Sequence, residues 1–316
     1  MSDMRKCAII GAGNVGATTA FSLMQSALFS ELVLIDINQE RASGEAADLN
    51  HALPFLSPME IYAGDYPDIA DASLIIITAG AAQAQGQTRL DLLRANARVF
   101  REIVERICKY NHDALLLVVT NPVDILTEIT RRICDFPPHR VIGSGTVLDT
   151  ARLKFLMGRH LGVDARHVHA FIIGEHGDTE LPVYSSANIS GLDLEHFCAG
   201  DHPTCSNADL DRLFCQTRDA AYHIIKGKGS TYYAVAEAVR RIVTAIVRDE
   251  SAILPVSVSL TGEYGLSGIS LSLPCIVGKD GISRVLEMPL SAEEEAMLRR
   301  SAARMHEVLD GVWKTV

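Results

Sequence analysis

The fold is decided by the stretch Cys7-Ala8-Ile9-Ile10-Gly11-Ala12-Gly13-Asn14-Val15-Gly16, near the start of the chain. Its first four residues form an apolar run typical of a buried strand, and residues 18–24 continue as a helix-like run. In this context Gly11 permits a tight turn, Gly13 lets a pyrophosphate approach the backbone, and Gly16 allows close packing of helix on strand. The stretch therefore predicts a phosphate-binding turn at the positively polarised N-terminus of a helix.

An acidic residue at the end of the next apolar run extends this pattern. Asp36 follows Gly16 by 20 residues, the spacing at which a carboxylate can reach the ribose hydroxyls of a bound dinucleotide. A carboxylate there would repel a 2′-phosphate, which favours NAD over NADP. By itself the glycine pattern is also compatible with a flavin or with a turn that binds no ligand.

The first half of the chain alternates short apolar runs with helix-like segments. The runs at residues 7–10, 32–35, 74–77 and 115–119 lack the alternation of a half-exposed strand, which predicts strands buried on both faces in a parallel sheet. Residues 90–110 have apolar side chains at helical spacing. This order predicts a doubly wound α/β domain of the Rossmann type over residues 1–143, ending after Pro137-Pro138.

The second half has a different pattern and predicts an α+β domain over residues 144–316. We expect a helix at residues 148–161, an antiparallel sheet at 254–273 and a hairpin turn at Asp280-Gly281. Ser291 and Glu294 have the spacing of a capping box at the start of a C-terminal helix.

Composition excludes several classes of protein. The net charge of −10 over 316 residues disfavours general binding to nucleic acid or anionic membranes. We find no apolar run long enough to cross a bilayer and no signal peptide, so we expect a soluble cytoplasmic protein. The seven cysteines form no CxxC pair and are expected to be reduced thiols. Cys198, His202 and Cys205 match no zinc pattern, so no metal is expected.

Four polar elements follow apolar runs or share a helix face. They are Gly174-Glu175-His176-Gly177-Asp178, the pair Asp149 and Arg152 one helical turn apart, the loop at residues 79–89, and Thr120-Asn121-Pro122-Val123-Asp124. The third and fourth elements each leave the end of an apolar run, and loops after parallel strands are where open α/β sheets bind ligands. In this combination and order, the motifs resemble the lactate/malate dehydrogenase family over essentially the whole chain.

The resemblance implies a reversible hydride transfer between NAD and a 2-hydroxy acid. His176 would be the proton donor and acceptor, held by Asp149, because an imidazole titrates near neutral pH and a carboxylate favours its charged form. Arg152 would bind the substrate carboxylate through two parallel hydrogen bonds, for which a guanidinium has matching geometry. Arg89, on the loop, would polarise the carbonyl group once the loop excludes water.

The resemblance also implies which residues contact the cofactor. Asn121 would lie near both nicotinamide and substrate. The set is Gly11, Gly13, Val15, Gly16, Asp36, Arg41, Tyr66, Gly80, Ala81, Asn121 and Ser144.

The substrate preference depends on Gln83 in the loop. Malate dehydrogenases carry an arginine at the matching position, where it pairs with the second carboxylate of oxaloacetate. Gln83 has no charge and Thr231 matches the lactate-type residue, so pyruvate is the expected substrate. Malate, another L-2-hydroxy acid, and a non-catalytic NAD-binding role are the alternatives.

The resemblance further implies a homotetramer that takes part in glycolytic fermentation. Some bacterial relatives are activated by fructose 1,6-bisphosphate through an arginine and a histidine. His169 matches the histidine, but Lys154 stands where the arginine is expected. A lysine can hold phosphate as a point charge with poorer geometry, so activation stays open.

Overall fold

A nine-stranded sheet forms the centre of the molecule in the computed structural model, which describes residues 5–80, 89–199 and 205–313. Its strand order is β12-β11-β10-β6-β5-β4-β1-β2-β3. The strands from β6 to β3 run parallel, and the winding direction of the chain reverses between β1 and β4, where such sheets bind ligands. Their bounds are β1 (Lys6–Ile10), β2 (Glu31–Ile35), β3 (Glu60–Ala63), β4 (Leu74–Ile77), β5 (Leu115–Val118) and β6 (Val141–Gly143).

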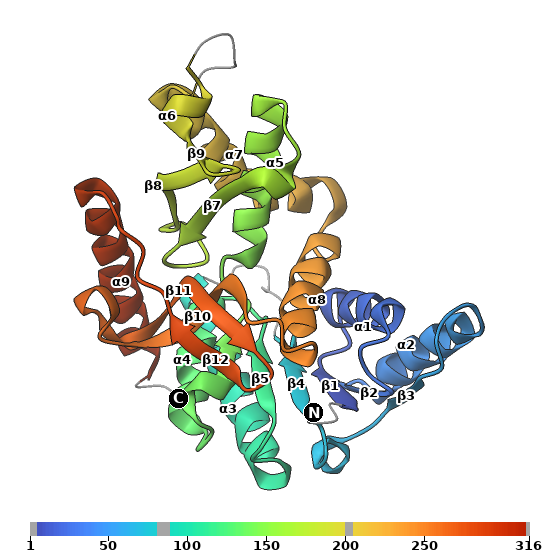
Figure 1. The fold of residues 1–316 in the computed structure, drawn as a ribbon. Helices are drawn as coiled ribbons and strands as arrows, with labels where there is room; N and C mark the ends of the chain where they lie inside the picture. Colours follow the sequence, from blue (N-terminus) through green and yellow to red (C-terminus); the bar gives the residue numbers. More distant parts are fainter. Residues whose placement is uncertain (1–4, 81–88, 200–204, 314–316) are drawn as a thin grey trace.

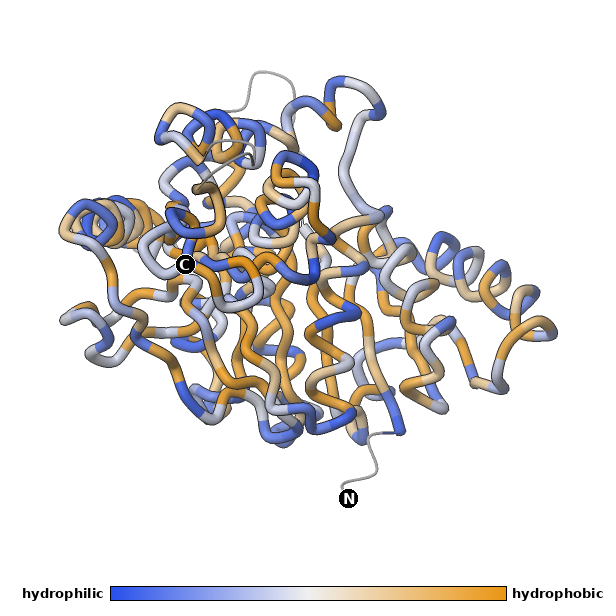
Figure 2. The backbone as a smooth tube through the Cα atoms, turned by 45° about the horizontal axis from the view of Figure 1, so that its top comes forward, coloured by the Kyte–Doolittle hydropathy of each residue, from blue (hydrophilic) through white to orange (hydrophobic). Residues whose placement is uncertain are grey.

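The inner parallel strands are apolar along their length because both faces of the sheet are covered. Every residue of β1, β4 and β5 is buried. Figure 2 shows these strands as mostly hydrophobic segments in the middle of the molecule. The strands expected at residues 7–10, 32–35, 74–77 and 115–119 are confirmed, with small differences at their ends, and so is the helix expected at 90–110, which is α3 (Arg89–Tyr110).

Three antiparallel strands extend the same sheet. They are β10 (Ala252–Thr261), β11 (Ser267–Gly278) and β12 (Gly281–Val285), and they confirm the predicted antiparallel strands and hairpin turn. The sequence did not indicate that β10 would join the parallel strands, which it does where Ser257 pairs with Gly143. The sheet therefore continues past residue 143, and the division into residues 1–143 and 144–316 stays a prediction.

A second, antiparallel sheet stands with α5, α6 and α7 above the large sheet in Figure 1. It contains β7 (Val168–Ile173), β8 (Leu181–Ile189) and β9 (Leu192–Asp193). The helix expected at residues 148–161 is α5 (Val147–Leu161). The predicted fold class, a Rossmann-type parallel sheet followed by an α+β part with antiparallel sheet, is confirmed.

The helices connect and cover these sheets. The C-terminal helix begins with the predicted capping box, because Ser291 N–H donates to Glu294 Oε2 at 2.8 Å and Glu294 N–H donates to Ser291 Oγ at 3.2 Å. The C-terminal helix is α9 (Ala292–Trp313), and the other α-helices of the described residues besides α3 and α5 are α1 (Asn14–Ser26), α2 (Gln39–Ala52), α4 (Val123–Ile133), α6 (Leu194–Phe197), α7 (Asn207–Lys228) and α8 (Tyr233–Val247).

One pair of cysteines differs from the expectation. Cys198 and Cys205 form a disulfide, with Cα atoms 5.9 Å apart, so the prediction of reduced thiols is wrong for these two residues. Their spacing alone does not indicate the pairing, because it depends on how α6 and α7 bring the two residues together. His202 lies outside the described residues. Among the helices of the described residues, none has the length and apolar character needed to span a membrane.

Candidate active site

The glycine-rich turn lies between β1 and α1, at the carboxyl end of the sheet. Gly11 has a φ of +107°, and a Cβ on Gly16 would lie 1.8 Å from the Gly11 carbonyl oxygen, so both positions need glycine. A Cβ on Gly13 would meet no atom within 4 Å, which leaves open space beside the N-terminus of α1. This space and the helix N-terminus fit the pyrophosphate of NAD.

Asp36 lies beside this turn, as the spacing predicts. Its carboxylate accepts hydrogen bonds from Ala12 N–H at 2.7 Å and Asn38 N–H at 2.8 Å. Each oxygen retains a lone pair for a ribose hydroxyl. The side chain is thus held at the carboxyl end of β2, where it can select the unphosphorylated ribose.

The other proposed cofactor contacts come from several elements. Gly80, Asn121 and Ser144 follow the carboxyl ends of β4, β5 and β6. Val15 is in the first turn of α1 and Arg41 is exposed on α2. Tyr66 is buried, with the Arg106 guanidinium carbon 3.8 Å from its ring centroid. Ala81 lies outside the described residues.

A chain of three charged side chains forms the centre of the candidate site. His176 lies in the turn between β7 and β8, and Asp149 and Arg152 lie on α5. His176 Nδ1 is 2.5 Å from one carboxylate oxygen of Asp149, and Arg152 donates to the other oxygen at 2.8 Å. These three predicted residues are therefore brought together, although 27 positions separate Asp149 from His176.

The mutual contacts shift the pKa values of this pair in opposite directions. Burial would lower the pKa of His176, but the neighbouring Asp149, with Asp124 and Glu180, raises it to about 9. Burial would raise the pKa of Asp149, but His176 and then Arg152 hold it below its ordinary value. The site therefore holds an imidazolium beside a carboxylate at neutral pH.

Two buried acids beside His176 were not assigned a role from the sequence. Asp124, at the start of α4, accepts from the backbone N–H of His176 at 2.7 Å and from Ser257 Oγ at 2.6 Å. Glu180 is the last residue of the turn before β8 and is 4% exposed. Both lie inside or next to motifs quoted above, but only their burial in the fold distinguishes them from solvated acids.

The structure describes only some of the remaining predicted substrate residues. Gln83 lies outside the described residues, and Arg89 begins α3 with a side chain that is not described. Thr231 lies between α7 and α8, and its neighbour Ser230 accepts from Asn14 Nδ2 at 3.1 Å, beside the glycine-rich turn. The predicted effector residues are Lys154, half-buried on α5, and His169, exposed on β7.

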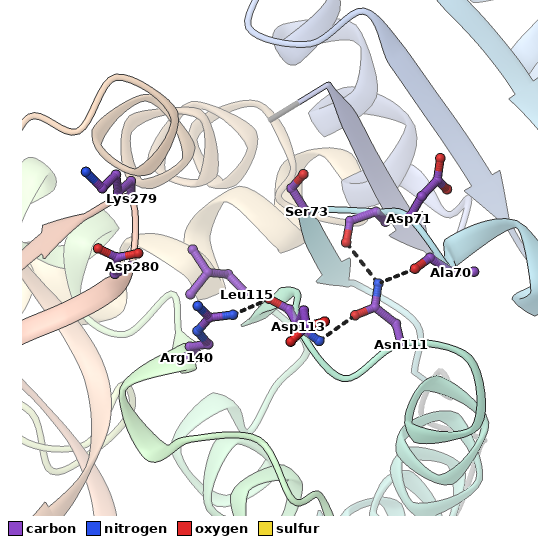
Figure 3. Close-up of a pocket in the computed structure, with 10 residues that line it drawn as sticks. Ala70, Asp71, Ser73, Asn111, Asp113, Leu115, Arg140, Lys279 and Asp280 are labelled. Carbon is purple, nitrogen blue, oxygen red and sulfur yellow. Dashed lines mark hydrogen bonds between the residues drawn. The ribbon is translucent and has the colours of Figure 1, made fainter. Parts of the chain in front are cut away.

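Two of the hollows lined by described residues are separate from the His176–Asp149 pair. One, of about 320 Å³, opens at the amino ends of β4 and β5 and is shown in Figure 3. Its Asn111 amide donates to the carbonyl oxygens of Ile69 and Ala72 and accepts from Asp113 and Ala114 N–H, so its polar atoms serve the fold. The other, of about 730 Å³, lies between α5 and α7 and has Arg152 at its wall.

Comparisons with known proteins cover almost the whole chain. Residues 5–143 match the model of the lactate/malate dehydrogenase NAD-binding domain, and residues 146–316 match that of its alpha/beta C-terminal domain. The chain is 53% identical to an L-lactate dehydrogenase of Acetivibrio thermocellus, over 97% of this chain and 96% of the relative. It is 50% identical to one of Priestia megaterium, over 97% and 96%. A crystal structure of the minor L-lactate dehydrogenase of Enterococcus mundtii superposes with a TM-score of 0.95, at 39% identity, over 98% of this chain and 99% of the other.

Proposed function

We propose, from the premise that the chain belongs to the lactate/malate dehydrogenase family, that it is an NAD-dependent L-lactate dehydrogenase. The observation that carries the proposal is the hydrogen-bonded chain of His176, Asp149 and Arg152. In this chain an imidazole that can donate a proton and a guanidinium that can bind a carboxylate share one buried aspartate. The relatives named above support lactate over malate.

His176 supplies the proton in this reaction. When bound, NADH supplies the hydride that reduces the carbonyl carbon of pyruvate. The carbonyl oxygen then takes the proton of His176 Nε2, because Nδ1 faces Asp149. The raised pKa of His176, about 9, keeps this proton in place at neutral pH before substrate binds, and Asp149 stabilises the imidazolium.

Arg152 holds the carboxylate of the substrate. One of its terminal nitrogens is bonded to Asp149 at 2.8 Å, and its side chain is 14% exposed, so the other donors of the guanidinium are available for a carboxylate. We assign Arg89 to the carbonyl oxygen, Asn121 to substrate and nicotinamide, and Gln83 and Thr231 to the methyl end.

Absorbance of NADH tests the proposal directly. We expect fast oxidation with pyruvate and slow oxidation with oxaloacetate when each is mixed with purified protein and NADH. A preference for oxaloacetate would leave the fold and the role of His176 unchanged but would overturn the choice of substrate. No oxidation with either, by protein that binds NADH, would contradict the assignment as a lactate dehydrogenase.

Exchange of Gln83 for arginine tests the proposed substrate preference. Gln83→Arg supplies a cation for the second carboxylate of oxaloacetate, so kcat/KM for oxaloacetate should rise by about tenfold or more relative to pyruvate. The kcat/KM values for both substrates are the measurement. If the ratio of kcat/KM for oxaloacetate to kcat/KM for pyruvate does not change, Gln83 does not contact the variable end of the substrate.

Three further assignments complete the proposal. We place the protein in the cytoplasm as a homotetramer. We also assign the response to fructose 1,6-bisphosphate to Lys154 and His169. Burial lowers the pKa of Lys154, yet a lysine still offers phosphate a point charge. Size-exclusion chromatography with light scattering tests the homotetramer. The pyruvate assay with and without fructose 1,6-bisphosphate tests the effector response.

A further inference from the structure

One carboxyl oxygen of Glu180 lies buried beside the candidate active site without a hydrogen-bond partner among the described residues. The residue is 4% exposed, and its Oε1 is buried and accepts no hydrogen bond from any residue that the structure describes. One of its oxygens lies within 4.8 Å of a carboxylate oxygen of Asp149 and of a ring nitrogen of His176. A buried acid of this kind needs an explanation.

The cations around Glu180 are bound to other acids. The charged groups that face it are Asp149 and Arg152 on α5, His176 in the same turn, and Arg218 on α7. The side chains of Arg152 and His176 are both hydrogen bonded to Asp149, and Arg218 is hydrogen bonded to Asp219 at the surface. An ionised carboxylate here would bury Oε1 with no donor among the described residues and beside a second carboxylate, which is strongly unfavourable.

We infer that Glu180 is a neutral acid in the resting site and acts as a positioning residue, which leaves the charge of Arg152 available for the substrate carboxylate. The inference rests on the proposed function. Burial, followed by the Asp149 carboxylate, raises the pKa of Glu180 to about 9, in agreement with the geometry. Loss of this proton would add a negative charge beside Arg152 and weaken substrate binding, while the proton donor itself would remain His176.

The isosteric variant Glu180→Gln tests this with a comparison of KM and kcat for pyruvate at pH 7 and pH 10, with saturating NADH. At pH 7 both constants should stay within about threefold of wild type, because an amide replaces a neutral acid. At pH 10 about one tenth of Glu180 retains its proton, so KM should rise about tenfold more in wild type than in the variant. An ionised Glu180 would also raise the pKa of His176, so kcat is measured beside KM to follow the His176 proton, and the inference is judged on KM.

Thermal unfolding against pH gives a readout that does not depend on activity. Folded Glu180 keeps its proton up to a pKa of about 9, whereas the unfolded chain releases it above a pKa of about 4.3. Stability from this group is therefore present below about pH 4 and is lost as pH rises to 9. The melting temperature of Glu180→Gln should rise relative to wild type across that range.

The exposed Glu195→Gln, on α6, is the matched control and should change neither readout. A variant with a markedly altered KM at pH 7, an equal rise of KM in both proteins at pH 10, or a melting-temperature difference that is constant with pH would each overturn the inference. If wild type does not reduce pyruvate, the proposed function fails, and the unfolding comparison still decides the protonation of Glu180.

Discussion

Two regions of this molecule are built by different physical means: the cofactor side, which is the parallel strands with the glycine-rich turn at residues 11–16, and the junction, which is the cluster of Asp124, Asp149, Arg152, His176 and Glu180. On the cofactor side, β4, β5 and the part of β1 after Lys6 are contiguous apolar runs, and all three strands are buried throughout. At the junction the buried groups include the acids Asp124, Asp149 and Glu180, taken from α4, α5 and the turn before β8. Shape and apolar burial maintain the first region, whereas charge pairing between distant segments maintains the second.

This difference predicts which kind of substitution will perturb each region. Interiors are close-packed, so the glycine-rich turn should respond to added volume and little to charge. A buried charge without its partner is costly, so the junction should respond to the loss of a single charge at constant volume. Isosteric and space-filling substitutions therefore separate the two regions.

The largest effect should come from Asp149→Asn, which keeps the volume at the junction and removes one charge. Without the carboxylate the pKa of His176 should fall from about 9 towards its ordinary value of about 6.5. The charged form of His176 is then no longer favoured at neutral pH, and kcat for pyruvate reduction should fall by about 10²- to 10⁴-fold at pH 7. The dependence of kcat on pH should move its alkaline fall to lower pH, since His176 must be protonated to act.

A second Asp–His pair supplies the control for this variant. Asp193 Oδ2 lies 2.8 Å from His196 Nδ1, and both side chains are well exposed. Asp193→Asn should leave kcat and its pH dependence unchanged. If Asp149→Asn retains kcat within threefold of wild type, or if both variants behave alike, charge pairing at the junction is not what supports the reaction.

The cofactor side offers the complementary test, with one methyl group at two glycines. Gly16→Ala forces a Cβ to 1.8 Å from the Gly11 carbonyl oxygen, so the apparent melting temperature of the NADH-free protein should fall by roughly 5 °C or more. Gly13→Ala meets no atom within 4 Å and should leave that temperature unchanged. The methyl group added by Gly13→Ala fills the space assigned to the pyrophosphate, so KM for NADH should rise by about tenfold or more.

Two results would contradict this reading of the glycine-rich turn. One is an equal loss of stability in both variants, which would mean that Gly13 is packed. The other is an unchanged KM for NADH in Gly13→Ala, which would move the pyrophosphate away from α1.

The same contrast explains how much could be predicted from the sequence. The four parallel strands, α3, α5 and the antiparallel pair were predictable because their signals are local periodicity and glycine spacing. The extension of the parallel sheet by β10 was not, because it depends on the single pair of Ser257 with Gly143, far apart in the chain. The Cys198–Cys205 disulfide was missed for a related reason.

The candidate site was predictable to the extent that motifs carry it. His176, Asp149 and Arg152 were identified by resemblance, and the structure places them in contact. Asp124 and Glu180 look like ordinary acids in the sequence, because their burial and their hydrogen bonding are properties of the assembled fold. Sequence pattern thus locates the groups that we propose to react, and only tertiary structure shows which neighbouring groups set their charge.

The smallest effect should come from Asp124→Asn, which tests whether every buried acid at the junction matters equally. Burial raises the pKa of Asp124 to about 6, against about 3.9 in the unfolded chain. Its contribution to stability is thus present below about pH 4 and lost as pH rises to 6. Asn Oδ1 can still accept from His176 N–H and its Nδ2 can donate to the Ser257 oxygen, so the variant should gain on the order of 2 kcal/mol relative to wild type between pH 4 and 7.

The effect of Asp124→Asn on activity should be small, because Asp124 holds the backbone of His176 and Asp149 holds its ring. We expect kcat within about threefold of wild type at pH 7 and an alkaline limb displaced to lower pH by less than the displacement in Asp149→Asn. Unfolding monitored at pH 4 to 7 and the kcat profile measure both effects. A loss of kcat as large as that of Asp149→Asn would show that fixing the turn matters as much as pairing the ring, and the junction would then depend on shape as the cofactor side does.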